Sequence, residues 1–178
     1  MAEEDFTEHF VSGESLFRGR LLDVRRDTVR MPDGALATRE YIRHPGAVAM
    51  LPLLPGDRVV LIRQFRYPNA RHFIEIPAGK LEPGEDRLEC AKRELLEETG
   101  YVASSWERLT TIHNAIGYSD ESIEIYAARG LEKKEQALDE EEFLQVFEIP
   151  RVEAVAMVRD GRITDVKTII ALLWDLKI

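Results

Sequence analysis

The chain has 178 residues, of which 44% are hydrophobic and 32% are charged. This length and composition predict a globular protein that is large enough to bury a core. The net charge of −9 at pH 7 argues against nucleic acid or an anionic membrane as the main partner, because both would repel an acidic surface.

The opening residues and the cysteine content indicate a cytoplasmic protein. The segment MAEEDFTEHF is acidic and lacks the basic and apolar regions of a signal peptide. The longest apolar run, at 47–54, is far shorter than the ~20 residues of a membrane helix. One cysteine, Cys90, excludes an internal disulfide and suits a reducing compartment. We expect no catalytic role for Cys90.

The first third of the chain predicts β structure. Residues 16–43 read as an antiparallel hairpin that turns at Pro32-Asp33-Gly34. Two core strands are expected at 46–53 and 58–65, separated by a Pro-Gly-Asp turn, and a further strand at 73–77 follows them.

A helix is predicted after the turn at Pro83-Gly84. Glu85 is expected in its first turn, where the helix dipole favours a negative charge, and Gly100 is expected to end it in a left-handed conformation. An apolar face recurs at helical spacing through Leu88, Ala91 and Leu95.

Another face of this helix carries carboxylates. Glu94, Glu97 and Glu98 lie within one turn, so their side chains share a surface. Like charges at this spacing destabilise a helix unless a cation neutralises them, and Mg²⁺ prefers such oxygen ligands. Arg93 lies within the group and could orient one carboxylate. From charge alone, a solvated acidic face is the simpler interpretation.

The spacing of residues 79–101 favours the metal interpretation. Gly79 is followed by Glu85, by Arg93-Glu94-Leu95, by Glu97-Glu98 and by Gly100-Tyr101. This order matches the Nudix box, G-x5-E-x7-R-E-U-x-E-E-x-G-U with U an apolar residue, at every fixed position. The chain therefore resembles the Nudix hydrolases.

The resemblance implies metal-dependent hydrolysis of a nucleoside diphosphate that is linked to another group. Carried over by position, Glu94 and Glu98 are the main metal ligands, Glu97 assists, and the backbone carbonyl of Ala78 is a further ligand. Glu97 and Arg93 also belong to the implied catalytic set. The expected cofactor is Mg²⁺, with Mn²⁺ as an alternative.

Other segments resemble the ADP-ribose pyrophosphatases within this superfamily, notably 39–53 and 63–68. Arg39, Arg66, Glu75 and Gly117 are therefore expected to contact the substrate. The planar fork of Arg66 suits a phosphate, although an arginine at a strand end is often an ion-pair partner. Glu75 lies on the opposite face from its apolar neighbours, and it either faces the site or is solvated.

The loop at 113–121, between strands expected at 106–112 and 122–128, departs from the subfamily. Ile116 replaces the proline that is commonly taken to mark a preference for ADP-ribose, whereas Gly117, Ser119, Asp120 and Glu121 keep the rest of the pattern. This departure leaves other substrates open, such as GDP-mannose and ADP-glucose.

The charged segment at 131–142 predicts a solvated loop by composition. By resemblance, a glutamate of this loop accepts the proton of the attacking water, just before an apolar strand. Glu142 occupies that position, and Glu140 and Glu141 are the alternatives.

The end of the chain reads as two helices, at 152–159 and 165–176. The resemblance implies an α/β/α Nudix sandwich with a mixed sheet over 46–178. It also implies an N-terminal antiparallel β subdomain over 1–45 that pairs with the other subunit of a homodimer.

The expected reaction is the hydrolysis of ADP-ribose to AMP and ribose 5-phosphate. A sensor that binds nucleotides without cleaving them is the alternative from another class. The complete set of carboxylates argues against it, and no DNA-binding extension is evident.

Overall fold

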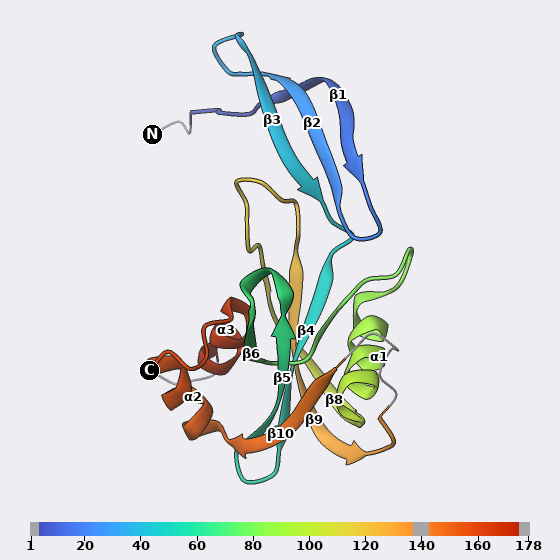
Figure 1. Cartoon of the computed structure of the whole chain (residues 1–178), viewed down its shortest axis with the longest axis vertical. Coiled ribbons are helices and arrows are strands. Elements are labelled where there is room, and N and C mark those ends of the chain that lie inside the picture. The colour runs from blue at the N-terminus through green and yellow to red at the C-terminus, as the bar shows by residue number, and fades with distance from the viewer. Residues whose placement is uncertain (1–3, 137–142, 175–178) are drawn as a thin grey trace. The chain divides into compact units, whose positions relative to one another are not determined.

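The computed structural model describes residues 4–136 and 143–174 (Figure 1). The chain divides into two compact units. The first comprises 1–45 with 113–122, and the second comprises 46–112 with 123–178. Each unit is described by itself.

The N-terminal unit is an antiparallel sheet of three strands, β1 (His9–Arg18), β2 (Asp23–Arg30) and β3 (Leu36–Arg43), in that order. The turn after β2 lies at 32–34 as expected, with Gly34 at a φ of 87°. The expected hairpin is wrong in one respect, because residues 19–22 form a turn and β1 is an additional strand. Its Gly13 and its polar residues weaken the local strand signal, and pairing with β2 supplies what local propensity does not.

The segment 113–122 joins this unit through the end of β3. Ile42 donates its N–H to Tyr118 O at 2.8 Å and accepts from Asp120 N at 3.2 Å. The carboxylate of Asp120 also accepts from the backbone N–H of His44 at 2.7 Å. These hydrogen bonds attach Tyr118 and Asp120 of the loop to the end of β3 and to His44, which follows it.

The second unit is a mixed sheet in the order β10-β5-β4-β9-β8, with β6 paired to β5 and β7 paired to β4. Only β4 and β9 run parallel among the described pairs of this sheet. The strands are β4 (Ala47–Leu54), β5 (Arg58–Arg66), β6 (Arg71–Glu75), β7 (Ala78–Lys80), β8 (Tyr101–Ile112), β9 (Ile123–Lys133) and β10 (Leu144–Pro150).

Helices cover both faces of this sheet. Helix α1 (Arg87–Thr99) lies on one face, and α2 (Arg151–Arg159) and α3 (Val166–Trp174) lie on the other (Figure 1). A short 3₁₀ turn, Tyr67–Asn69, links β5 to β6. The expected α/β/α sandwich with a separate N-terminal β sheet is confirmed.

Strand β4 shows why the core has two layers. Ala49 and Leu51 belong to the apolar cluster beneath α2 and α3, whereas Val48 and Met50 belong to the cluster beneath α1. Successive side chains of a strand point to opposite faces, so a continuous apolar run of this kind is typical of a strand covered on both sides. The central strand therefore anchors α1 and α3 to the same sheet.

Two expected boundaries were wrong. Strand β8 begins at Tyr101 rather than at 106, and β9 continues to Lys133, which the composition placed in a loop. The two strands pair from Tyr101↔Lys133 onward, so sheet pairing holds polar residues in an extended conformation there. None of the helices in the described ranges is long and apolar enough to cross a membrane.

Candidate active site

Helix α1 is fixed at both ends by its own sequence. The Asp86 side chain caps the start by accepting from Leu88 N at 2.9 Å and Glu89 N at 3.2 Å. Gly100 ends the helix at a φ of 68° and donates to Leu96 O, which confirms the predicted left-handed cap. Ala91 and Leu95 are fully buried against the sheet, so the rotation of the helix is also set.

Glu85 was expected in the first helical turn, and this was wrong. It precedes the capping residue Asp86, and its carboxylate accepts from Arg93 Nε at 2.9 Å and Nη2 at 3.0 Å. It also accepts from the backbone N–H of Glu82 at 2.9 Å. These hydrogen bonds, that from Arg93 first, lower the pKa of Glu85 to about 2. Glu85 therefore holds the Arg93 side chain in place, and it is not a charge within the first turn of the helix.

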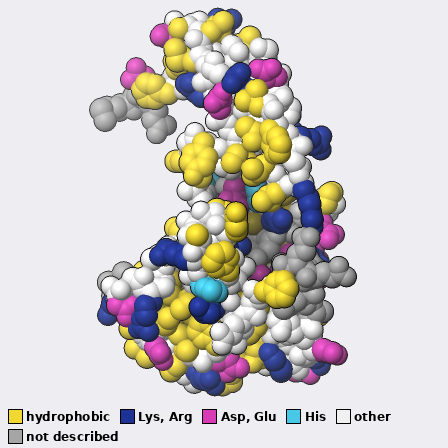
Figure 2. Space-filling model, viewed as in Figure 1, with side chains coloured by type: hydrophobic (Ala, Val, Ile, Leu, Met, Phe, Trp, Pro, Cys, Tyr) yellow, Lys and Arg dark blue, Asp and Glu magenta, His cyan; other side chains and the backbone are white. Residues whose placement is uncertain are grey.

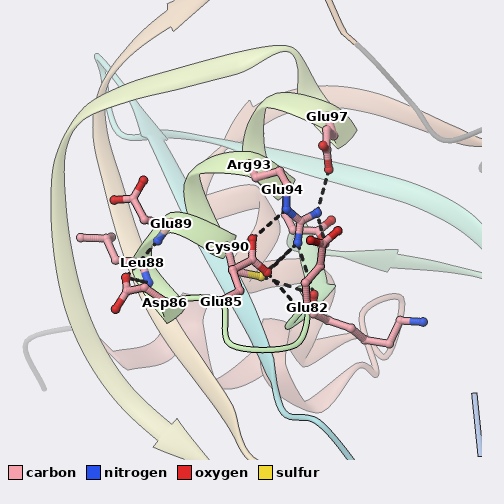
Figure 3. Close-up of polar contacts among 10 residues, drawn as sticks. Glu82, Glu85, Asp86, Leu88, Glu89, Cys90, Arg93, Glu94 and Glu97 are labelled. Carbon is pink, nitrogen blue, oxygen red and sulfur yellow. Dashed lines mark hydrogen bonds and ion pairs between the residues drawn. The ribbon is translucent and has the colours of Figure 1, made fainter.

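Arg93 lies at the centre of the carboxylates of the box (Figure 3). Its Nη1 contacts Glu94 Oε1 at 2.8 Å and Glu97 Oε2 at 2.9 Å, in addition to the pair with Glu85. The hydrogen bond with Glu85 is the main cause of a raised pKa for Arg93, so the guanidinium remains charged. It contacts three carboxylates, where the sequence suggested one.

Glu98 is the most enclosed of the acidic residues on α1. It is 3% exposed, and its Oε2 accepts from the backbone N–H of Ala78 at 3.0 Å. The side chain of Glu94 is also largely covered, at 13% exposed, whereas that of Glu97 is 33% exposed. A solvated acidic face is therefore wrong for Glu98 and Glu94. A charged carboxylate at such depth needs compensation by hydrogen bonds or a cation.

Gly79 lets the backbone of β7 pass directly over Glu94. A Cβ at this position would lie 1.8 Å from Glu94 Cδ and 2.0 Å from Oε1, so the end of the Glu94 side chain would have to move. The glycine of the box thus allows the carboxylate of Glu94 to lie this close to the backbone.

We expect Gly79→Ala to displace the Glu94 carboxylate and to raise the Mg²⁺ concentration needed for half-maximal activity about tenfold or more. The measurement is a Mg²⁺ titration of hydrolysis. Gly56→Ala is the control, because its Cβ meets nothing within 4 Å although its φ of 75° strains the backbone. An unchanged Mg²⁺ dependence in folded Gly79→Ala would contradict the role given to this close approach.

The residues around the Ala78–Gly79 backbone suit a hard divalent cation. Glu94, Glu97 and Glu98 offer only oxygen donors, and at least two of them are enclosed. Over the ranges 4–136 and 143–174, no three acidic, histidine or cysteine groups are already gathered as a metal cluster. Glu94 and Glu97 instead both accept from Arg93 Nη1.

Arg66 and Glu75 form a pair on β5 and β6. Arg66 Nε and Nη2 each bond one oxygen of Glu75 at 2.8 Å. Glu75 is 2% exposed, so the solvated interpretation of this residue is wrong. The hydrogen bond with Glu75 raises the pKa of Arg66. The pair fixes the plane of a guanidinium that remains partly open to solvent, with 42% of its side chain exposed.

Arg39 and Gly117 belong to the other compact unit. Arg39 lies on β3, and its guanidinium binds the carboxylate of Glu8 through Nε at 2.9 Å and through Nη2. Gly117 lies in the loop with the strongly exposed Ile116, and a Cβ at Gly117 would meet no atom within 4 Å. The structure thus brings Arg66, Glu75, Ala78 and the box carboxylates together in one unit.

Glu140, Glu141 and Glu142 lie outside the described residues. The segment that precedes them caps the end of α1: Lys133 Nζ donates to Thr99 O at 2.7 Å, Lys134 N to Gly100 O at 2.6 Å, and Gln136 Nε2 to Glu98 O. On the other side, Leu144 pairs with Gln64 of β5. The sequence did not identify this cap, because Lys133 lies 34 residues beyond Thr99 in the chain and only the fold brings the two together.

Sequence reasoning also missed Lys167 and Thr168, which contact β6 from the start of α3. Lys167 is 8% exposed and binds Glu75, and Thr168 accepts from Ile76 N at 2.8 Å. A lone lysine in the otherwise apolar run VKTIIALLW was the available signal, because a lysine in a buried helix needs a partner.

Comparison with known proteins places these features in a family. Residues 43–171 match the model of the NUDIX domain, and residues 8–42 match that of the nucleoside diphosphate sugar hydrolase N-terminal domain. The chain therefore belongs to the Nudix family of hydrolases, which confirms the resemblance read from the box.

Among its relatives are two proteins from bacilli. The methanol dehydrogenase activator of Bacillus methanolicus is 43% identical over 95% of this chain and 92% of its own length. The ADP-ribose pyrophosphatase of Bacillus subtilis (strain 168) is 36% identical over 94% of this chain and 91% of its own length. A crystal structure of an ADP compounds hydrolase superposes with a TM-score of 0.85 at 24% identity, covering 97% of this chain and 94% of that one, and so shares the fold.

Proposed function

We propose that this protein hydrolyses ADP-ribose to AMP and ribose 5-phosphate. The observation that carries the proposal is the arrangement of the Nudix box, in which enclosed Glu98 and Glu94 face the Ala78–Gly79 backbone. The likeness to a named ADP-ribose pyrophosphatase over 94% of the chain supports the substrate. Water adds to one phosphorus of the diphosphate, and the bond from that phosphorus to the bridging oxygen breaks.

Glu94, Glu97 and Glu98, with the carbonyl of Ala78, would hold the cation, for which Mg²⁺ is the simplest choice and Mn²⁺ an alternative. When bound, such a cation neutralises the diphosphate and lowers the pKa of a water molecule. Arg93 bonds both Glu94 and Glu97 through Nη1, which offsets the repulsion between the two carboxylates. Arg93 therefore maintains the geometry of the ligands.

Arg66 would bind the diphosphate or the terminal ribose. Glu75 fixes its guanidinium, and the exposed part of the side chain can reach an anion. Arg39 and Gly117 are also proposed as substrate contacts, on the basis of the resemblance alone.

Glu142 would accept the proton of the attacking water. The segment up to Gln136 is tied to the end of α1, next to Glu97 and Glu98, and Leu144, the first residue of β10, pairs with Gln64 of β5. These two attachments are to α1 and β5, and both elements carry proposed site residues. This favours a residue between Gln136 and Leu144 as the base.

The decisive experiment compares hydrolysis of ADP-ribose, GDP-mannose, ADP-glucose and NADH with Mg²⁺. We expect ADP-ribose to be cleaved about tenfold faster than the others, a discrimination of about 1.4 kcal/mol. A faster rate with another sugar nucleotide would leave the hydrolytic site in place and point to Ile116 as a determinant of substrate choice. Binding of ADP-ribose without cleavage would favour a sensor.

A second function is favoured by the 43% identity with the methanol dehydrogenase activator. The chain would then act as an activator of a methanol dehydrogenase. Adding the protein to a methanol dehydrogenase with Mg²⁺ tests this, with Glu98→Gln as the control. A stimulation that survives Glu98→Gln would separate activation from hydrolysis.

We also propose that the N-terminal segment 1–45 forms a homodimer with its counterpart. Every residue of β1 is exposed, and the exposed large apolar residues of this unit include Phe10, Leu16, Phe17 and Leu36. Figure 2 shows hydrophobic side chains on the surface of this unit. Such a surface is typical of an interface. Light scattering is expected to give twice the 20.4 kDa of one chain, and a monomer at micromolar concentration would contradict it.

We propose a cytoplasmic location with no nucleic-acid partner, in line with the acidic charge.

A further inference from the structure

A buried ionic network links α3 to the site. Lys167 Nζ contacts Glu75 Oε2 and lies 3.0 Å from Asp165 Oδ1, although Lys167 and Glu75 are only 8% and 2% exposed. Lysine and glutamate are almost never buried to this extent unless they are paired. The pair spans 92 residues of sequence. It therefore fixes α3 to β6 at one defined position.

The network continues from Glu75 to Arg66. Both oxygens of Glu75 accept from Arg66, and one of them also accepts from Lys167. Burial alone raises the pKa of Glu75, but the Arg66 hydrogen bond and the two cations outweigh it, so the pKa of this carboxyl lies below its ordinary value. Glu75 is therefore a charged carboxylate shared by two cations.

Because Arg66 and Lys167 share the Glu75 carboxylate, Lys167 affects how Arg66 can bind an anion. With Glu75 as its sole partner, the charge of Arg66 would be largely cancelled by one carboxylate. Lys167 supplies a second positive charge to the same carboxylate, but Asp165 pairs with Lys167 and Glu98 also acts on Arg66, so the network has no net positive charge. What Lys167 provides at Arg66 is therefore a fixed position of the Glu75 carboxylate. Among the described residues, Arg66 Nη1 takes no part in the hydrogen bonds to Glu75 and remains directed elsewhere.

The next residue of α3 holds the backbone of β6. Thr168 Oγ1 accepts from Ile76 N at 2.8 Å and donates to Asp165 Oδ2 at 2.5 Å, while Asp165 caps Thr168 N at 3.0 Å. Two residues beyond Ile76, Ala78 N meets Glu98. The short stretch 75–78 is thus held by α3 at one end and by α1 at the other.

We propose that Lys167, with Thr168 and Asp165, is a positioning residue that acts through Glu75 to fix the orientation of Arg66 for binding the substrate diphosphate. The inference rests on the proposed function, since it assumes that Arg66 binds substrate. A purely stabilising role explains the arrangement less well, because apolar residues of similar volume commonly serve stability as well as a buried ion pair does. The network also ends on a side chain that is 42% exposed rather than closing within the core.

The test is a double-mutant cycle on ADP-ribose hydrolysis with Lys167→Met, Arg66→Ala and both together. We expect Lys167→Met to raise KM about tenfold with kcat within about threefold, because uniform substrate binding is what is lost. In the Arg66→Ala background, Lys167→Met should have no further effect on KM, since coupled residues are not additive. Lys167→Arg should restore most of the loss.

Lys92→Met is the matched control, because Lys92 forms an exposed pair with Glu89 on α1. Its KM should match that of the wild type. Additive effects of Lys167→Met and Arg66→Ala, or a fall in kcat at unchanged KM, would overturn the proposal. If Lys167→Met fails to fold by circular dichroism, Lys167→Gln replaces it, and unfolding of both would assign Lys167 to stability alone and overturn the proposal.

The same cycle separates this inference from the proposed function. If the wild type cleaves no ADP-ribose, the hydrolytic function fails, and the calorimetric affinity for ADP-ribose takes the place of KM in the cycle. If the wild type cleaves ADP-ribose but Arg66→Ala leaves KM unchanged, Arg66 is not a substrate ligand and Lys167 cannot act through it.

Discussion

Replacing Glu98 with glutamine is expected to lower kcat on the order of 10³-fold while the protein remains folded. Glutamine has the size of glutamate, and its amide oxygen can still accept from Ala78 N, so the contact that holds β7 to α1 survives. The negative charge does not survive. At a site that is 3% exposed, the charge is what a divalent cation would need, and water cannot replace it.

The measurement is kcat for ADP-ribose over a range of Mg²⁺ concentrations, together with the thermal midpoint of unfolding. Glu89→Gln is the control, because Glu89 lies on the same helix but pairs with Lys92 at the surface. It should retain wild-type kcat. Rates like those of the wild type in folded Glu98→Gln would remove Glu98 from the set of metal ligands.

Local sequence signals predicted the parts of the fold that depend on local physics. Gly100 ends α1 because a left-handed cap favours glycine, and Ala91 and Leu95 are buried because the helical period places them on one face. Glu85 shows the limit of such signals. The position of Glu85 suggested a favourable place for a negative charge in a helix. The helix instead begins at Arg87, and Arg93 in its second turn donates two hydrogen bonds to Glu85.

Pairing between distant segments was not readable from local spacing. The extra strand β1 and the extensions of β8 and β9 contain polar residues with weak strand propensity, and partner strands hold them. For the same reason the contact between Lys167 and Glu75 could not be predicted, because it depends on where α3 packs against β6. The box itself was readable because one helix and one turn carry it.

The second large effect is expected for Glu142→Gln, which should lower kcat roughly 10²–10⁴-fold, the range for loss of a positioned general base. Glutamine cannot accept the proton of the attacking water at neutral pH. The Mg²⁺ dependence should change little, because the proposed ligands Glu94 and Glu98 are untouched. Loss of kcat at constant Mg²⁺ affinity is thus the signature that separates this variant from Glu98→Gln.

Glu140→Gln and Glu141→Gln, measured in parallel, are the matched controls, since each removes one charge from the same acidic run. Each should lower kcat only a few-fold. If one of them instead shows the large loss and Glu142→Gln does not, the base is that neighbour, and its place in the run still follows the anchored segment after Gln136. If all three variants keep kcat near that of the wild type, the proton is accepted outside this loop, and the water must be activated by groups that α1 and β6 provide.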